Sequence, residues 1–330
     1  MRASSRTLRS SCSEPCAVGR FDSLGAVRAL FRYGFFPVVF FGALAVGVVL
    51  MDRGWSPMLA TGAVTFSCAL IIGLSEKVQP RYASWAEPQR DDWKADLAHT
   101  FLSTLLPPEI IRAVSVGALT GGAVLLASVV GAPLWPSSWP VLAQLVVAML
   151  VSELGSYWAH RLMHENATLW RLHAVHHSAE RLYWLNAGRF HPLDTAIQYV
   201  GQTFPLILLG ASPEVLALFS LWTAVHGMFQ HANLDIRLGP LNWVFSMAEL
   251  HRWHHSTLVA EGNTNYGANI CFWDIVFGTR FLPKDREPPE EIGIAALPAF
   301  PSGYLAHLAS PFRWEGVVEE SRPSTPTPPS

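Results

Sequence analysis

The sequence predicts an all-α integral membrane protein, built as a bundle of about four transmembrane helices plus a re-entrant hairpin, with a cytosolic histidine-rich helical cap. Half of the 330 residues are apolar and only 15% are charged, whereas an average soluble domain carries about 25% charge. Four long uncharged runs alternate with polar connections, and twelve of the thirteen histidines follow the start of the last run. These observations favour a membrane protein with a polar active region at one end.

The composition also excludes several classes of protein. The formal net charge is −2, and the chain has neither a phosphate-binding glycine loop nor a basic run interleaved with aromatic residues, so nucleic acid is not an expected partner. The four cysteines lack the spacing of a zinc finger or a disulfide framework. Residues 1–30 are rich in serine and arginine and lack the pattern of a cleaved signal peptide, so we expect a disordered basic tail.

The uncharged runs predict two transmembrane hairpins. Residues 34–51 contain eighteen residues without a charge, which at about 1.5 Å per residue nearly cross a hydrocarbon core of about 30 Å. Residues 57–74 are equally uncharged and complete the first hairpin. After a polar stretch, residues 113–134 and 141–158 form the second hairpin.

A fifth apolar stretch, residues 194–225, is interrupted by Pro205, Gly210 and Pro213. The halves are about sixteen and eleven residues long, and the second is too short to cross a bilayer. We therefore expect a re-entrant or tilted hairpin packed against the other helices.

The remainder defines the domain limits and the orientation. Residues 288–330 are proline-rich and need not form a packed core, which leaves a single membrane domain over residues 31–287. The basic residues concentrate in the N-terminal tail, the polar stretch before the second hairpin and the region after residue 160. The positive-inside rule places these parts, and the histidines with them, on the cytoplasmic side.

Ten histidines form four short groups between positions 160 and 255. Residues three and four apart share one face of a helix, so each group can direct two or three imidazoles to one place. The groups are His160 and His164; His173, His176 and His177; His226 and His231; and His251, His254 and His255.

The repeated H-x-x-H-H pattern indicates metal binding rather than a solvated helix face. One tetrahedral zinc takes three or four protein ligands, so ten imidazoles suit two metal sites. Imidazole alone does not choose between zinc, copper and iron. A zinc protease is excluded, because Glu165 follows His164 without the second histidine of an H-E-x-x-H motif. The isolated His99 and His307 are expected to be ordinary hydrogen-bonding residues.

In the order H-x(3)-H, H-x-x-H-H and H-x-x-H-H, and in the surrounding segments "LNAGRFHP", "FQHANLDIRLGPLNWVF" and "GNTNYGANICFWDIVFGT", the chain resembles the fatty acid hydroxylase/sterol desaturase superfamily. The resemblance covers about residues 75–283. It implies a helical membrane anchor under a cytosolic cap that holds two iron ions, with O₂ as the co-substrate for hydroxylation or desaturation of a lipid.

The same resemblance implies the roles of individual residues. Eight histidines correspond to the three motifs, and His226 and His231 occupy an intermediate position where relatives often add ligands. No catalytic residue is expected beyond the metal centre. The predicted ligands are His160, His164, His173, His176, His177, His226, His231, His251, His254 and His255.

Further residues are expected to support the ligands. Glu153, Glu249 and Asp274 lie near the motifs in sequence and can accept a ring N–H, as ligating histidines require. Arg189 and His191 belong to the superfamily pattern, and we expect them to support the histidine motifs rather than bind metal.

The expected partners follow from the chemistry. Breaking an unactivated C–H bond requires metal-bound oxygen, and the chain contains neither a dinucleotide fingerprint nor a fused haem domain. We therefore expect a lipid substrate from the bilayer and a separate electron donor, such as a reductase acting with a ferredoxin or a cytochrome b5-like protein. The expected location is a membrane, the bacterial inner membrane rather than the endoplasmic reticulum.

Two alternative functions remain open at this stage. Within the superfamily, the substrate could be an ether lipid cleaved as in alkylglycerol monooxygenases, which use tetrahydrobiopterin. From a different class, a histidine-rich membrane metal transporter or sensor would also concentrate imidazoles. It would more plausibly place them at mid-membrane or in a low-complexity loop than at helix ends with fixed spacing.

Overall fold

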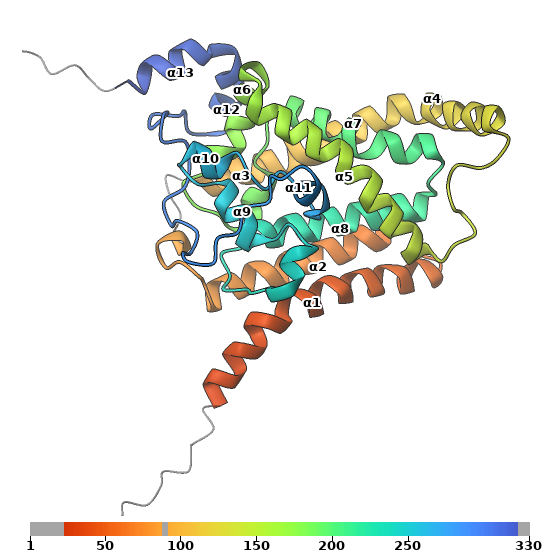
Figure 1. Cartoon of the computed structure of the whole chain (residues 1–330), viewed down its shortest axis with the longest axis horizontal. Coiled ribbons are helices and arrows are strands. Elements are labelled where there is room, and N and C mark those ends of the chain that lie inside the picture. The colour runs from red at the N-terminus through yellow and green to blue at the C-terminus, as the bar shows by residue number, and fades with distance from the viewer. Residues whose placement is uncertain (1–22, 88–91, 323–330) are drawn as a thin grey trace, which may run out of the picture.

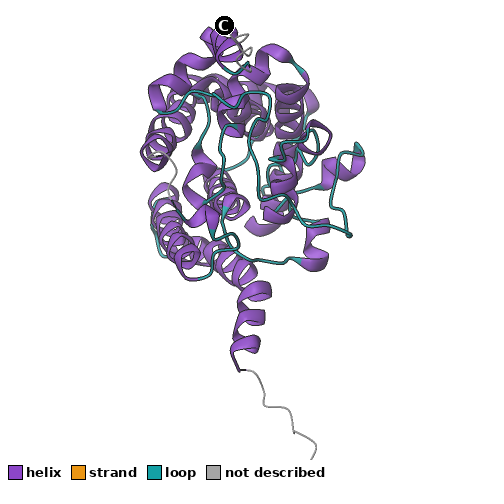
Figure 2. Ribbon diagram, turned by 90° about the vertical axis from the view of Figure 1, so that its left-hand side faces the viewer, coloured by secondary structure: helices purple, strands orange, loops and turns teal. Residues whose placement is uncertain are grey.

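The computed structural model describes residues 23–87 and 92–322. Within these ranges every regular element is helical, and β-pairing is limited to isolated bridges (Figure 2). Four helical stretches have the length and apolar composition needed to cross a membrane. The predicted class, a helical membrane bundle, is therefore confirmed.

The first predicted hairpin is formed by α1 (Ser23–Asp52) and α2 (Pro57–Val78). The Ser56 side chain accepts a hydrogen bond from the backbone N–H of Leu59 and so caps α2. Pro57 suits the first helical position because its missing N–H would have no partner there. α1 begins eleven residues before the uncharged segment that predicted it, and α2 continues four residues beyond its segment.

The third candidate span, Asp92–Val130, is 39 residues long and contains a change of helix type. The long helix contains α3 (Asp92–Ala98), the π-helical turn η2 (His99–Leu105) and α4 (Leu106–Val130). Pro107 and Pro108 lie in the first turn of α4 and lack the N–H groups that would donate to the preceding carbonyls, so hydrogen bonds of the α-helical ladder are missing at this point. The fourth span is α5 (Val141–Glu165).

The interrupted apolar stretch forms α7 (Pro192–Leu209) and α8 (Pro213–His231). Pro205 does not break the chain as expected, because α7 continues through it. The break comes at Gly210, whose positive φ of 93° ends α7 in a left-handed cap. The second half is therefore a helix of 19 residues, and it packs against α1, α2 and α5 in the centre of the bundle.

One contact between α5 and α7 depends on two glycines. A Cβ atom added to Gly155 would lie 2.0 Å from the carbonyl oxygen of Gly201, and one added to Gly201 would lie 3.0 Å from the carbonyl oxygen of Gly155. The two backbones therefore touch without intervening side chains. Helices in membranes approach this closely only through small residues.

Short helices between and after the long ones build the cap. In Figure 1, α9 and α10 lie at the left of the bundle, whereas the connections from α1 to α2, from α4 to α5 and from α7 to α8 lie at the right. The elements are η1 (Ser84–Ala86), α6 (Ala167–His177), η3 (Trp184–Gly188), η4 (Gly239–Trp243), α9 (Ala248–His254), α10 (Val259–Gly262) and α11 (Phe272–Val276).

Both chain ends differ from the expected tails where the structure describes them. Residues 23–30 already belong to α1, and residues 1–22 and 323–330 lie outside the described ranges. The proline-rich C-terminal segment contains α12 (Tyr304–Ala309), η5 (Ser310–Arg313) and α13 (Trp314–Glu320). His307 and Val317 are buried, so this segment packs onto the cap instead of remaining a separate tail.

Candidate metal centre

Nine of the ten predicted ligand histidines meet in two groups. Within each group, one potential ligand atom from every residue lies within 4.8 Å of those from the others. Group A is His160, His164, His173, His177 and His254. Group B is His176, His231, His251 and His255.

Helix periodicity divides the α6 histidines between the groups. His173 and His177 are four residues apart, share one face of α6 and point into group A. His176 directly precedes His177, so its side chain projects from a different face of α6 and belongs to group B. One H-x-x-H-H motif therefore supplies a pair to one group and a single imidazole to the other.

The second H-x-x-H-H motif makes the opposite division. His251 and His255 are four residues apart and enter group B, whereas His254 enters group A. Each group thus receives a pair from one motif and a single ring from the other. The α5 pair His160 and His164 completes group A, and His231 at the end of α8 completes group B.

Six of these nine rings direct Nδ1 toward an oxygen atom. Because a carbonyl or carboxylate oxygen only accepts a hydrogen bond, Nδ1 carries the proton and Nε2 of the neutral ring keeps a free lone pair. The acceptors are Tyr266 O for His160, Asn263 Oδ1 for His164, Asp194 Oδ2 for His173, Arg189 O for His176, Asn186 Oδ1 for His231 and Thr264 O for His254.

The Nε2 atoms converge in the interior. The Nε2 atoms of His160 and His173 are 3.0 Å apart, and those of His231 and His251 are also 3.0 Å apart. His160 and His173 both carry the proton on Nδ1, so their Nε2 lone pairs face each other and cannot form a hydrogen bond, whereas a cation between them would bind both. A metal ion about 2.0–2.1 Å from each nitrogen, as for zinc and imidazole, fits between such atoms.

Burial keeps the rings outside the membrane spans neutral. Burial lowers the pKa of His176 to about 3 and those of His177, His254 and His255 well below the usual range. These imidazoles are therefore unprotonated at neutral pH. The unprotonated imidazole is the form that binds metal.

The two groups are in direct contact. The rings of His177 in group A and His255 in group B stack with their centroids 4.5 Å apart. His173 and His176, from different groups, have ring centroids 5.2 Å apart. The arrangement therefore suits two neighbouring metal ions in one centre.

His226 lies outside both groups. Its ring is fully buried beside Phe36 and Phe40 of α1. His191 caps α7 by accepting a hydrogen bond from the N–H of Leu193 and also contacts the carbonyl of Leu308. His191 therefore supports the start of α7, and no direct contact with a grouped histidine ring is seen among the described residues.

The three predicted supporting carboxylates do not contact the clustered histidine rings directly. Glu153 binds Asn269, and Glu249 binds the N–H of Leu238. Asp274 accepts hydrogen bonds from the N–H groups of Tyr266 and Gly267. Asp274 thus fixes the loop whose Tyr266 carbonyl accepts from His160, so its support is indirect.

Sequence reasoning missed two of the residues that contact the rings directly, whereas Arg189, expected to support the motifs, accepts from His176. Asp194, in the first turn of α7, is fully buried and lies 2.7 Å from Nδ1 of His173. Asn186 accepts from His231 at 2.9 Å, and its amide N–H₂ donates to the carbonyl of Arg181, which fixes its orientation. The one sequence signal for Asp194 is its place two residues after "RFHP".

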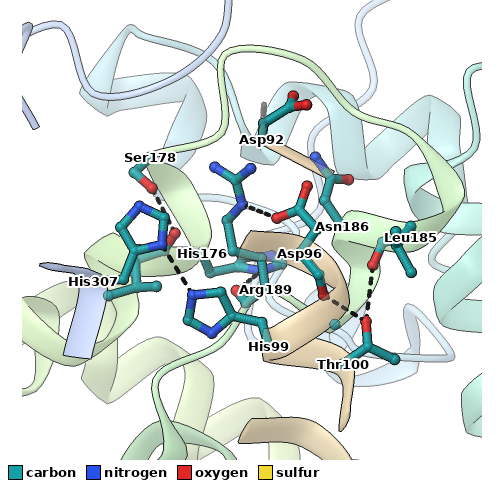
Figure 3. Close-up of polar contacts among 12 residues, drawn as sticks. Asp92, Asp96, His99, Thr100, His176, Ser178, Leu185, Asn186, Arg189 and His307 are labelled. Atoms are coloured by element: carbon teal, nitrogen blue, oxygen red, sulfur yellow. Dashed lines mark hydrogen bonds and ion pairs between the residues drawn. The ribbon is translucent and has the colours of Figure 1, made fainter. Parts of the chain in front are cut away.

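A second polar network adjoins group B (Figure 3). The Arg189 guanidinium binds the buried carboxylate of Asp96, and the Arg189 carbonyl accepts from His176. The Phe190 ring stacks on His176 with a centroid distance of 4.1 Å. His99 and His307, expected to be ordinary hydrogen-bonding residues, bind each other in this network at 2.9 Å.

Comparison with known proteins shows which proteins resemble this chain in sequence. The family model described as "Fatty acid hydroxylase" matches residues 145–279. The ornithine lipid hydroxylase OlsE of Rhizobium tropici is 38% identical over 281 residues, which cover 83% of this chain and 82% of that protein. No solved structure matches this chain significantly.

Two eukaryotic relatives match a smaller part. The alkylglycerol monooxygenase of Danio rerio is 34% identical over 158 residues, covering 46% of this chain and 32% of the relative. The methylsterol monooxygenase 1 of Rattus norvegicus is 27% identical over 146 residues, covering 44% and 48% respectively. The histidine motifs lie within the residues that the family model matches.

Proposed function

Because this chain belongs to the fatty acid hydroxylase family, we propose that it is a membrane-bound di-iron oxygenase that hydroxylates a lipid, with His231 and the eight motif histidines as metal ligands. The observation that carries the proposal is the convergence of potential ligand nitrogens from nine histidines in groups A and B. The domain that performs the reaction is residues 31–287, to which the C-terminal helices add a wall.

The reaction consumes one O₂, two electrons and two protons for each oxygen atom inserted into a C–H bond, with water as the second product. Bound iron supplies the activation of O₂, which no side chain provides. The chain's own residues hold and orient the ligands: Asp194 keeps a proton on Nδ1 of His173 and so leaves Nε2 free for metal.

Lipid and electrons come from different directions. The exposed apolar surfaces of the spans face the bilayer, from which a lipid can enter laterally. The electrons come from a separate donor, a reductase acting with a ferredoxin or a cytochrome b5-like protein. The positive-inside rule places the histidine groups, and therefore this donor, on the cytoplasmic side.

The relatives support one class of lipid substrate over the others. The ornithine lipid hydroxylase matches over 83% of the chain, whereas the ether-lipid and sterol enzymes match less than half of it. We therefore propose an amino-acid lipid as the substrate, with ether-lipid cleavage as the alternative. Ether-lipid cleavage would release a fatty aldehyde rather than leave a hydroxyl group on an intact lipid.

Comparative lipid analysis tests the function. Cells that express the wild-type chain should accumulate an amino-acid lipid heavier by one oxygen atom, and cells that express His176→Ala should not. The label from ¹⁸O₂ should appear in that product. Identical lipids in the two cultures, under aerobic conditions with a competent electron donor, would refute the proposal.

A further inference from the structure

A cavity of about 330 Å³ opens in the cap between α3, the segment that follows α6 and the C-terminal residues 300–307. Its volume is at the lower end of the range of about 300–1,000 Å³ for small-molecule sites. No member of group A or group B lines it. The charged and histidine side chains that line it are Asp92, Lys94, Glu180, Arg181, Arg189 and His307.

The guanidinium group of Arg189 has N–H donors in this cavity that bind no acceptor among the described residues. The residue is only 6% exposed, and its Nε donates to Asp96. Its two terminal nitrogens make no hydrogen bond with a described residue, and no dashed contact reaches them in Figure 3. A buried guanidinium group with unused donors favours an anionic acceptor with two oxygens.

Arg181 provides a comparison within the same cavity. Its Nε and one terminal nitrogen bind both carboxylate oxygens of Asp92, and the other terminal nitrogen donates to the carbonyl of Trp85. Arg181 is therefore fully engaged in holding the cap together. Arg189 is the arginine of this cavity that can bind a ligand.

The cavity also offers a negative group. Glu180 is exposed, and its carboxylate makes no ion pair or hydrogen bond with a described residue. Asp92, the other acid that lines the cavity, is already paired with Arg181. A ligand with only a negative charge would leave Glu180 unused, whereas a zwitterion satisfies both ends.

We propose that this cavity binds the zwitterionic head of an amino-acid lipid, with its carboxylate on the terminal nitrogens of Arg189 and its ammonium group on Glu180. The inference rests on the proposed function, whose substrate class it makes specific. Arg189 also links the cavity to group B, because its carbonyl accepts from His176 and the adjacent Phe190 stacks on that ring. A head bound here lies beside the metal centre.

Binding of two small probes to the full-length, metal-free protein in lipid nanodiscs tests the proposal by calorimetry. N-acetylornithine carries the carboxylate and the ammonium group, whereas N-acetylnorvaline has the same carbon chain without the amine. Glu180→Gln should lower the affinity for N-acetylornithine by roughly fivefold, the upper end for an exposed ion pair. The affinity for N-acetylnorvaline should not change. Glu291→Gln, the same change at another exposed glutamate of the cap, should affect neither probe.

A second variant examines the carboxylate end. Arg189→Lys retains a positive charge for Asp96 but loses the planar fork, so both probes should bind more weakly by a similar factor. The cavity is a simple anion site if three results are found together. Inorganic phosphate displaces N-acetylornithine, phosphate binds the Glu180→Gln variant as tightly as wild type, and the protein does not prefer the zwitterionic probe over N-acetylnorvaline. That result, equal weakening of both probes by Glu180→Gln, or no binding of either probe, would overturn the proposal.

The experiment separates this proposal from the proposed function. Probe binding needs neither metal nor turnover, so it can succeed in a protein that oxidises no lipid. Conversely, an oxidised amino-acid lipid in expressing cells, together with no probe binding, would leave the oxygenase function intact and exclude this cavity as the head-group site.

Discussion

The Nε2 atoms of His160 and His173 lie 3.0 Å apart, while each ring holds its Nδ1 proton against an oxygen atom of the protein. The chain thus positions two lone pairs toward one point before any metal binds. Preorganisation of this kind reduces the cost of ordering ligands and disfavours the doubly protonated state. The relationship is the structural basis of the first two predictions.

Metal content should follow group membership. Wild-type protein should contain about two iron ions per chain, one for each group, and His254→Ala should lose metal and all turnover because group A loses a ligand. His226→Ala should retain the metal of wild type, because its ring nitrogens lie outside both groups. Elemental analysis with helix content from circular dichroism checks both, and metal loss in His226→Ala would instead establish the ligand role that the sequence predicts.

Asp194→Asn should weaken metal binding while preserving the shape of the site. The buried carboxylate lies 2.7 Å from Nδ1 of His173, and removal of such a partner lowers metal affinity by about 10–100-fold. Competition with a chelator of known affinity measures the change. Glu214→Gln, in the first turn of α8 and exposed, is the control; equal affinities for the two variants would contradict the assigned role of Asp194.

Gly155→Ala should destabilise the bundle. The added methyl group would lie 2.0 Å from the carbonyl oxygen of Gly201, so α5 and α7 must separate; overpacking of this kind costs about 1–3 kcal/mol. Thermal unfolding in detergent should show a lower midpoint than for wild type. Gly117→Ala in α4, where nothing lies within 4 Å of the new methyl group, should unfold at or above the wild-type midpoint, and equal midpoints for the two variants would argue against the close contact.

Acid should destabilise the packing of the C-terminal helices α12 and α13 on the cap. Burial, the positive charge of Arg189 and His99 lower the pKa of His307 to about 3, whereas the unfolded chain binds this proton near pH 6.5. Between these values the unfolded state binds more protons than the folded state. The contribution of His307 to the free energy of unfolding therefore has its full value above about pH 6.5 and falls as the pH decreases toward 3.

His307→Phe should reduce this pH dependence. Denaturant unfolding of metal-free protein at several pH values, followed by tryptophan fluorescence, gives the slope of stability against pH for each chain. The variant should lose less stability than wild type between pH 6.5 and pH 4. Parallel curves would show that His307 is protonated to the same extent in the folded and unfolded states.

The features predicted from the sequence are those encoded by local pattern. Runs without charge are long enough to specify spans by themselves, so α1, α2 and α5 were found from composition. The spacing of His173, His176 and His177 gives their directions on a helix before the partners are known. The sequence does not predict that each H-x-x-H-H motif places one ring in the group that holds the other motif's pair. That arrangement depends on how α6 and α9 face each other.

The features that were missed depend on distant parts of the chain meeting. Asp194 contacts His173 across 21 positions, and Asn186 contacts His231 across 45. Glu153 is near a motif in sequence, but it binds Asn269 instead of a ring. Packing of α12 and α13 was missed for a similar reason, because proline content describes local backbone preference and not the surface that the segment meets.

The exchange of rings between α6 and α9 has a consequence for how the protein is made. Neither group can close on a nascent chain until His254 and His255 have been synthesised, although the α5 and α6 ligands emerge almost eighty residues earlier. Until then, the first imidazoles lie open to any divalent ion in the cell. Both groups are therefore complete only after α9 has been translated, so metal loading of the full centre follows that step.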